Sequence, residues 1–197
     1  MTANGVFALC AVTALTAQNT TGVTDIFDST RIFWRSSSTQ CLPTSSRCRQ
    51  DRHGILGRTD RNDCGKLKEY GAKHIVVDPV MVATSGAKLL RDDAVTALCE
   101  KLLPLAEVLT PNIPEAEILS GMTIQNAADM ERAAQTISEK YGCAVLCKGG
   151  HQINDADDLL WRGGAGKWFK GRRIDNPNTH APDARCPAPC VESREGL

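Results

Sequence analysis

The chain lacks an excess of charge of either sign. Its 197 residues carry 23 lysines and arginines against 23 aspartates and glutamates. Nucleic acids and anionic membranes are bound mainly through a surplus of positive side chains. The balance gives no indication of such a surface, and it favours small molecules or other subunits as partners.

Long apolar runs and regularly spaced cysteines are also absent. No stretch approaches the ~18 apolar residues of a membrane span, and the apolar start from Val6 to Leu15 lacks the basic residues that begin a secretory leader. Nine cysteines, an odd number without framework spacing, favour reduced thiols over disulfides. Cys186 and Cys190 have no second Cys or His pair nearby, so we expect no metal site there. These features together predict a cytoplasmic protein.

Stretches with and without a regular hydrophobic period alternate along the chain. The length suits a single domain with a sizeable core, and residues 1–28 and 66–180 show regular periodicity. Residues 29–64, rich in arginine and serine, and residues 181–197, rich in proline, show none. A structureless insert as long as 29–64 is unusual inside a compact domain. We therefore expect one incomplete domain over 1–197.

The patterned parts predict an α/β fold with a mostly parallel sheet and helices on its faces. Strands are expected at 7–15, 74–78, 107–110 and 144–148, a hairpin at 158–161 and 166–169, and a polar loop at 16–22. Helices are expected to end at 66–70, capped by Gly71, and to cover 92–103, 115–120 and 126–141, the last between Asn126 and Gly142. The helix over 92–103 carries an apolar stripe at Val95, Leu98, Cys99 and Leu102.

Several polar residues follow apolar strands in this pattern. They are Gln18, Asp78, Asn112 with Glu115, and Lys148. Ligands of open parallel sheets bind outside the carboxyl ends of the strands. Since the fold would bring these ends to one rim, we expect a ligand site there. Each residue alone is also compatible with ordinary loop chemistry.

Asn112 and Glu115 permit two interpretations. An amide and a carboxylate three residues apart at a helix start can organise hydrated Mg²⁺, which takes few protein ligands. The same spacing is that of a capping box, and Pro111 and Pro114 suit the turn and the first helical turn. Both interpretations remain open on these residues alone.

Lys148 is followed by Gly149 and Gly150, which permit close approach of the backbone to a ligand. Lys148 itself can neutralise a phosphate, or can be a solvated strand end. Asp78, before a proline, can be a simple turn former. We assign no catalytic role to His151 or His180.

Four segments carry a family resemblance: Asp78-Pro-Val-Met81, Thr84-Ser-Gly-Ala87, Leu109-Thr-Pro-Asn-Ile-Pro-Glu-Ala-Glu117 and Lys148-Gly-Gly-His151. They closely resemble the hydroxymethylpyrimidine/phosphomethylpyrimidine kinases of thiamine biosynthesis, which have the ribokinase-like fold. Residues 4–7 and 13–23 look like an early strand and loop of that family. The resemblance covers 1–28 and 66–180.

The resemblance implies ATP-dependent phosphorylation of hydroxymethylpyrimidine and its monophosphate with Mg²⁺, in a family that is commonly homodimeric. Gln18 matches a glutamine that contacts the pyrimidine, and Val80 a residue of the same pocket. Asp78 and Lys148 match positions near the nucleotide phosphates. The positions that order Mg²⁺ are matched by Asn112 and Glu115.

The chain departs from the family at the chemical step. After His180 the family continues Gly-Thr-Gly-Cys-Thr-Leu, a loop whose backbone N–H groups stabilise the transferring phosphoryl group. Here Ala181-Pro182-Asp183 follows, so no catalytic residue of that loop is retained. The family's first strand with its Gly-Gly-Ala-Gly segment is missing, and an apolar strand is replaced within 29–64.

A change of reading frame accounts for the departures. Codons can be chosen for residues 180–190 that, after one inserted base, read His-Gly-Thr-Gly-Cys-Thr-Leu-Ser-Ser-Ala-Met. Parts of 53–66 resolve into family sequence in the same way. We therefore expect a truncated, frameshifted relative of the kinase, from a decayed gene or a sequencing error, with little or no activity. The alternatives are a pyridoxal kinase-like enzyme and a non-catalytic pseudogene product.

Overall fold

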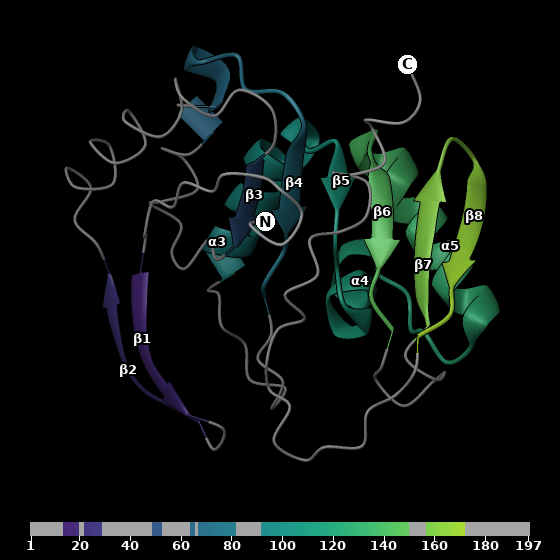
Figure 1. Cartoon of the computed structure of the whole chain (residues 1–197), viewed down its shortest axis with the longest axis horizontal. Helices are drawn as coiled ribbons and strands as arrows, with labels where there is room; N and C mark the ends of the chain where they lie inside the picture. Colours follow the sequence, from purple (N-terminus) through teal and green to yellow (C-terminus); the bar gives the residue numbers. More distant parts are fainter. Residues whose placement is uncertain are drawn as a thin grey trace.

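A computed structural model describes residues 14–19, 22–28, 49–52, 64–65, 67–81, 92–149 and 157–171. Its main feature is a six-stranded sheet, drawn in Figure 1, with the order β3-β4-β5-β6-β7-β8. The parallel strands are β3 (Arg49–Arg52), β4 (Ile75–Asp78), β5 (Val108–Leu109) and β6 (Ala144–Cys147). An antiparallel hairpin of β7 (Asp158–Arg162) and β8 (Ala165–Phe169) completes the sheet. The expected mostly parallel α/β architecture is confirmed.

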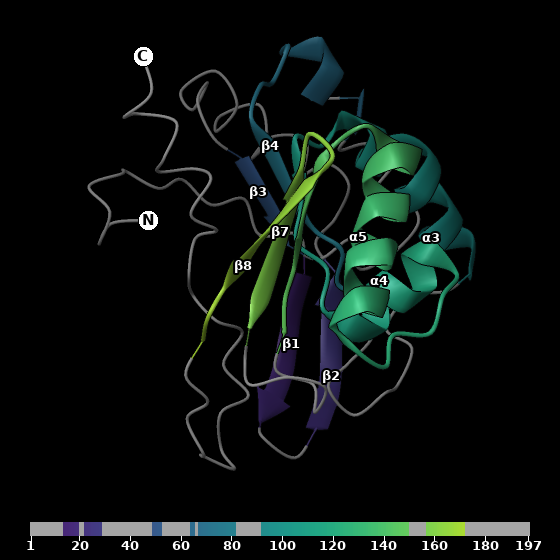
Figure 2. The ribbon, with the colours of Figure 1, turned by 90° about the vertical axis from the view of Figure 1, so that its right-hand side faces the viewer.

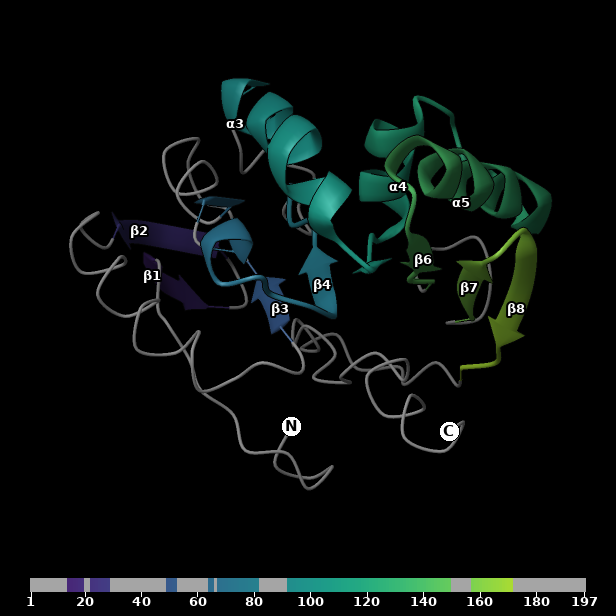
Figure 3. The same cartoon turned by 90° about the horizontal axis from the view of Figure 1, so that it is seen from above.

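The helices lie together on one side of this sheet (Figures 2 and 3). They are α3 (Asp92–Ala97), α4 (Ile113–Ser120) and α5 (Ala127–Tyr141). The helix predicted from 92 to 103 changes hydrogen-bond pattern within its length, because α3 continues as a π-helical turn, Leu98–Leu102, and a 3₁₀ turn, Leu103–Leu105. Its predicted apolar stripe is confirmed, with Leu98 and Leu102 buried and Val95 and Cys99 packed against the core.

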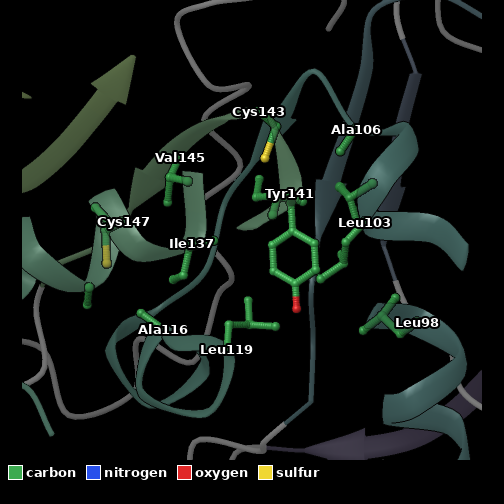
Figure 4. Packing of buried hydrophobic residues seen from close by; sticks show 14 of the residues in the cluster. Leu98, Leu103, Ala106, Ala116, Leu119, Ile137, Tyr141, Cys143, Val145 and Cys147 are labelled. Carbon is green, nitrogen blue, oxygen red and sulfur yellow. The ribbon is translucent and has the colours of Figure 1, made fainter. Parts of the chain in front are cut away.

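The core fills the space between these helices and the sheet. Val145 of β6 and Ile137 of α5 belong to it (Figure 4), as do Ile75 and Val77 of β4. Val76, between them, is 2% exposed and packs on the other face with Val108. Because both faces of the central strands are buried, β5, β6 and the first three residues of β4 are apolar at every position, as in other parallel sheets.

Local signals set the ends of α5. The side chain of Asn126 accepts a hydrogen bond from the backbone N–H of Asp129 at 3.0 Å. At the other end Gly142 adopts a φ of 68°, the left-handed conformation that closes a helix at low cost only in glycine. Both predicted boundaries are confirmed, as is the helix end at Gly71, where φ is 55°.

The N-terminal part corrects two expectations. β1 (Ala14–Asn19) and β2 (Gly22–Asp28) form a separate two-stranded antiparallel ribbon, so the polar loop predicted at 16–22 is wrong. Leu15, expected in a buried strand, is 59% exposed. An antiparallel ribbon can leave a face in water and so tolerates polar residues that sequence patterns assign to loops. Residues 7–13 lie outside the described residues.

The stretch without predicted pattern, 29–64, contributes the edge strand β3, which pairs with β4 in parallel register. Its sequence, Arg-Gln-Asp-Arg, has no apolar period. Without such a period, the pairing of β3 with β4 could not be predicted from the sequence. Charged residues are common in edge strands, where they protect against pairing with other chains. Residues 181–197 lie outside the described residues. In the part of the chain that the structure describes, no helix has the length and apolar character needed to cross a membrane.

Candidate active site

The carboxyl ends of β4, β5 and β6 bring several of the predicted residues together. Asp78 is the last residue of β4, and Lys148 directly follows β6. Asn112 and Lys148 form an isolated parallel bridge, in which the backbone N–H of Lys148 donates to the carbonyl of Pro111 at 2.8 Å. The sheet pairing itself therefore sets the distance between these residues.

The centre of this edge is an ion pair. Nζ of Lys148 lies 2.8 Å from Oδ1 of Asp78. The hydroxyl of Thr110, the residue after β5, donates to the same Oδ1 at 3.1 Å. Asp78 is 8% exposed and Thr110 4%, whereas 35% of the Lys148 side chain reaches solvent. Lys148 is thus neither a simply solvated strand end nor buried, and Asp78 is more than a turn former.

Asn112 and Glu115 form a capping box at the start of α4. Oδ1 of Asn112 accepts the backbone N–H of Glu115 at 2.9 Å, and Oε2 of Glu115 accepts the backbone N–H of Asn112 at 2.9 Å. The other oxygen of Glu115, Oε1, accepts the backbone N–H of Met81 at 3.3 Å. The capping interpretation is confirmed, and Glu115 in addition ties the loop after β4 to α4.

The environment of Glu115 changes its protonation. The residue is 1% exposed, and this burial raises the pKa of its carboxyl to about 7, with a further contribution from the negative charge of Asp78. Hydrogen bonding from the backbone of Asn112 and the positive charge of Lys148 act in the opposite direction. A cation placed beside the two carboxylates would favour the ionised form of Glu115.

The oxygen atoms at this edge suit a hydrated Mg²⁺ better than a dehydrated one. Mg²⁺ prefers oxygen ligands and keeps several waters. Both oxygens of Glu115 already accept backbone N–H groups, so contact through water fits their geometry. The described residues contain no group of three or more His, Cys, Asp or Glu side chains that could hold a metal ion. The residues predicted to order Mg²⁺, Asn112 and Glu115, therefore fit a hydrated ion contacted through water, and the carboxylate of Asp78 adds negative charge beside them.

The predicted pyrimidine residues lie in two different elements. Val80 is in the loop after β4, where its backbone N–H donates to the carbonyl of Asp78 at 2.9 Å and its side chain is half-buried. Gln18, predicted at the same rim as Asp78, lies inside β1 of the separate ribbon. The strand end expected at Gln18 is absent, because β1 continues to Asn19, and the role of Gln18 at the pyrimidine stays a prediction.

Gly149 has a structural requirement of its own. A Cβ on this residue would lie 2.1 Å from the carbonyl oxygen of Asp157, and its N–H donates to the side chain of Asp158 at 2.9 Å. The close approach predicted for a ligand is made here by the start of β7. Residues 150 and 151 and the stretch from 172 on, with His180 and Ala181, lie outside the described residues.

Thr110 is the site residue that sequence reasoning missed. It directly follows the short strand β5, and the registry of Val77 with Leu109 sets it opposite Asp78. A hydroxyl at a strand end beside a predicted Asp was the available signal. It becomes informative only once the neighbouring strand is known.

A lysine–aspartate pair at the carboxyl edge of a parallel sheet, next to a capped helix, fits the kinases of the ribokinase-like fold. Solved structures agree with this class. A phosphomethylpyrimidine kinase from Clostridium difficile is 35% identical with a TM-score of 0.79, covering 86% of this chain and 74% of its own. A pyridoxal kinase from Bacillus subtilis, solved with ADP, is 27% identical with a TM-score of 0.77, covering 93% and 68%.

Sequence comparison identifies the family within this class. The family model described as phosphomethylpyrimidine kinase matches residues 1–182. The hydroxymethylpyrimidine/phosphomethylpyrimidine kinase of Bacillus subtilis is 39% identical over 181 residues, 89% of this chain and 66% of the relative. That of Rhizobium meliloti is 41% identical over 181 residues, 89% and 67%. The chain belongs to the phosphomethylpyrimidine kinase family, as its motifs indicated, and spans about two thirds of the length of these relatives.

Proposed function

We propose that the edge formed by β4, β5 and β6 is the phosphate-binding part of an ATP-dependent kinase site for hydroxymethylpyrimidine and its monophosphate. The observation that carries the proposal is the ion pair of Lys148 with Asp78, 2.8 Å long and placed at the carboxyl ends of parallel strands. Ligands of such sheets bind at these ends. Family membership supplies the chemistry, because the named relatives are kinases of this substrate pair.

Each residue has a role in this proposal. Lys148 exchanges its carboxylate partner for a phosphate of ATP, which a compact ammonium can neutralise. Asp78, Glu115 and Asn112 hold the waters of Mg²⁺, which would supply charge neutralisation between the phosphates. Val80, beside Asp78 in the loop after β4, contacts the pyrimidine, as does Gln18 of the ribbon.

The chemical step is impaired in the chain as written. Phosphoryl transfer depends on positioned donors around the moving group, and Ala181-Pro182-Asp183 stands where the family has Gly-Thr-Gly. Loss of one such donor commonly costs ~10² to 10³ in rate. We therefore propose a protein that binds nucleotide and turns over little. Its role would then be that of a non-catalytic remnant of a kinase gene.

Calorimetric titration with ATP, with and without Mg²⁺, tests the site directly. Lys148→Met keeps the apolar stem and removes the charge, and we expect it to weaken binding at least ~10-fold, since hydrogen bonds to charged groups are strong. Lys167→Met is the matched control, because Lys167 lies exposed on β8. Equal affinity of the wild type and the Lys148→Met variant would refute the proposed site.

Pyridoxal is the second candidate substrate. The observation that favours it is the pyridoxal kinase from Bacillus subtilis, which matches 93% of this chain. The higher identity to the pyrimidine kinases favours hydroxymethylpyrimidine. Competition between the two compounds in the presence of ADP and Mg²⁺ separates these readings, and we expect hydroxymethylpyrimidine to bind more tightly.

The proposal also takes the localisation and the oligomeric state of the protein from its family. We propose a cytoplasmic homodimer whose ligands are the pyrimidine and ATP. Light scattering coupled to size exclusion gives the mass in solution, and a mass of one chain at all concentrations would argue against the dimer.

A further inference from the structure

We propose that Thr110 is a positioning residue of this site: its buried hydroxyl orients the carboxylate of Asp78 and thereby places Lys148 for a phosphate. The inference rests on the proposed function for its phosphate, and on the geometry of the described residues for the rest. Thr110 lies within the family-like segment 109–117, but the resemblance gives its hydroxyl no role and the predicted ligand set omits it.

The sheet fixes the backbone of Thr110, independently of the contacts of its side chain. Its backbone N–H donates to the carbonyl of Val77 at 3.0 Å, which extends the pairing of β4 with β5 by one step. The side chain is 4% exposed. Its hydroxyl therefore projects from a rigid support rather than from a loop, and positioned groups on rigid elements are held more accurately than groups on loops.

The hydroxyl acts on the atom that Lys148 also contacts. Oδ1 of Asp78 accepts from Oγ1 of Thr110 at 3.1 Å and from Nζ of Lys148 at 2.8 Å. Asp78 is 8% exposed, so water competes little for this oxygen, and a hydrogen bond to a charged group is strong in such surroundings. Loss of the hydroxyl would remove one of the contacts that fix this oxygen and so would loosen the partner of Lys148.

Lys148 needs this second constraint because its own side chain is long. Its backbone is held by the hydrogen bond to Pro111, at 2.8 Å, but its side chain has four rotatable carbons and is 35% exposed. The carboxylate of Asp78 defines where the ammonium rests. Thr110 thus connects the end of β5 to the positions of residues on β4 and after β6.

The first test measures the reactivity of Lys148 and does not require any ligand. The full chain and the variants Thr110→Val and Thr110→Ser are acylated with an N-hydroxysuccinimide acetate, and each lysine is followed by peptide mass spectrometry. An ion-paired amine reacts slowly, so Thr110→Val, which loosens this partly exposed pair without removing it, should raise the Lys148 rate roughly threefold. Thr110→Ser should react like the wild type, and Lys140 and Lys167 serve as internal standards.

A general loss of stability would give a different pattern. It would raise the rates of all lysines and lower the melting temperature, and serine would not restore Lys148 selectively. Asp78→Asn gives the rate of a Lys148 without its carboxylate. If valine does not yield a folded protein, Thr110→Ala replaces it in the same comparison. An unchanged Lys148 rate in the variant without the hydroxyl, or equal rates for serine and valine, would overturn the inference.

The second test uses Mg·ATP and separates the inference from the proposed function. We expect Thr110→Val to weaken binding by about tenfold, and Thr110→Ser to bind like the wild type. If the wild type binds no nucleotide, the proposed function fails, while the acylation rates still decide whether Thr110 positions Lys148. If the wild type binds and Thr110→Val binds equally well, the positioning role is refuted and the proposed function stands.

Discussion

Glu115 makes the stability of this protein depend on pH in a direction opposite to that of most carboxylates. Its pKa is raised from 4.5 to about 7 in the folded chain, mainly by burial. Between these values the folded protein holds a proton that the unfolded chain has released, so the free energy of unfolding falls as the pH rises. Each unit of difference between the folded and unfolded pKa values is worth ~1.4 kcal/mol. The free energy of unfolding should therefore fall by up to ~3 kcal/mol between acidic and neutral pH, and this contribution should not change further above neutral pH.

Urea unfolding at about pH 5 and about pH 8, followed by circular dichroism, measures this effect. The comparison is with Glu115→Gln, in which nothing titrates at this position. The other titrating groups are the same in both proteins. Between the two pH values, the free energy of unfolding should therefore fall by up to ~3 kcal/mol more in the wild type than in the variant. At about pH 5, where Glu115 is protonated, each of the two side chains offers one carbonyl oxygen to the backbone N–H groups of Met81 and Asn112, so the stabilities of the two proteins should lie closest there.

Asn126→Ala is the matched control for a helix that has lost its cap. It removes the acceptor of the Asp129 N–H and should cost about 1 kcal/mol. This decrease in the free energy of unfolding should be the same at both pH values, since the substitution removes no titratable side chain. Identical pH dependence in the wild type and in Glu115→Gln would refute the account of Glu115 as a buried, partly protonated carboxyl.

Three further substitutions test the packing. Tyr141→Phe should raise the free energy of unfolding by about 1 kcal/mol, because, among the described residues, the buried Tyr141 hydroxyl makes no hydrogen bond of normal geometry and has beside it only the weak partner Cys99; a loss of stability would show that the contact with Cys99 is an effective hydrogen bond. Ile137→Ala, at a position 0% exposed, should cost ~2 to 5 kcal/mol in urea unfolding, and a cost below that range would mean a loosely packed core. Gly149→Ala should displace β7, since its Cβ would meet the Asp157 carbonyl oxygen at 2.1 Å; unchanged amide spectra of β6 and β7 would contradict this.

Helices with their own capping residues and strands that are buried on both faces were predictable from the sequence. Residues 75–77 of β4 are all apolar because both faces of the strand are buried. The ends of α5 follow from Asn126 and Gly142, whose effects need no partner elsewhere in the chain. The alignment of Asp78 with Lys148 followed from the general rule for the ends of parallel strands.

Features that depend on a distant partner were not predictable. β3 has no pattern of its own and exists through its pairing with β4. Residues 16–22, which include most of β1, were predicted to be a loop because they are polar and their pairing with β2 is not visible in the sequence. Likewise the hydroxyl of Thr110 gains a role only from Asp78, 32 residues away. The double role of Glu115 depends on Met81, 34 residues away.

The hypothesis of a changed reading frame also stays a prediction. We expect the nucleotide sequence to carry family-like residues in another frame across 29–64 and after His180. Stops or unrelated residues in those frames would remove this explanation for Ala181-Pro182-Asp183, whereas the site at β4, β5 and β6 does not depend on it.

A coupled kinase assay tests the central claim most directly. Hydroxymethylpyrimidine, ATP and Mg²⁺ are supplied to the chain as written and to a repaired chain, each also with Lys148→Met. In the repaired chain residues 29–64 and those after His180 have family sequence, and the family's first strand with its Gly-Gly-Ala-Gly segment is added before Met1. We predict little or no turnover by the chain as written, turnover by the repaired chain, and its loss with Lys148→Met. Equal turnover with and without repair, or a repaired, folded chain that is unaffected by Lys148→Met, would contradict the account.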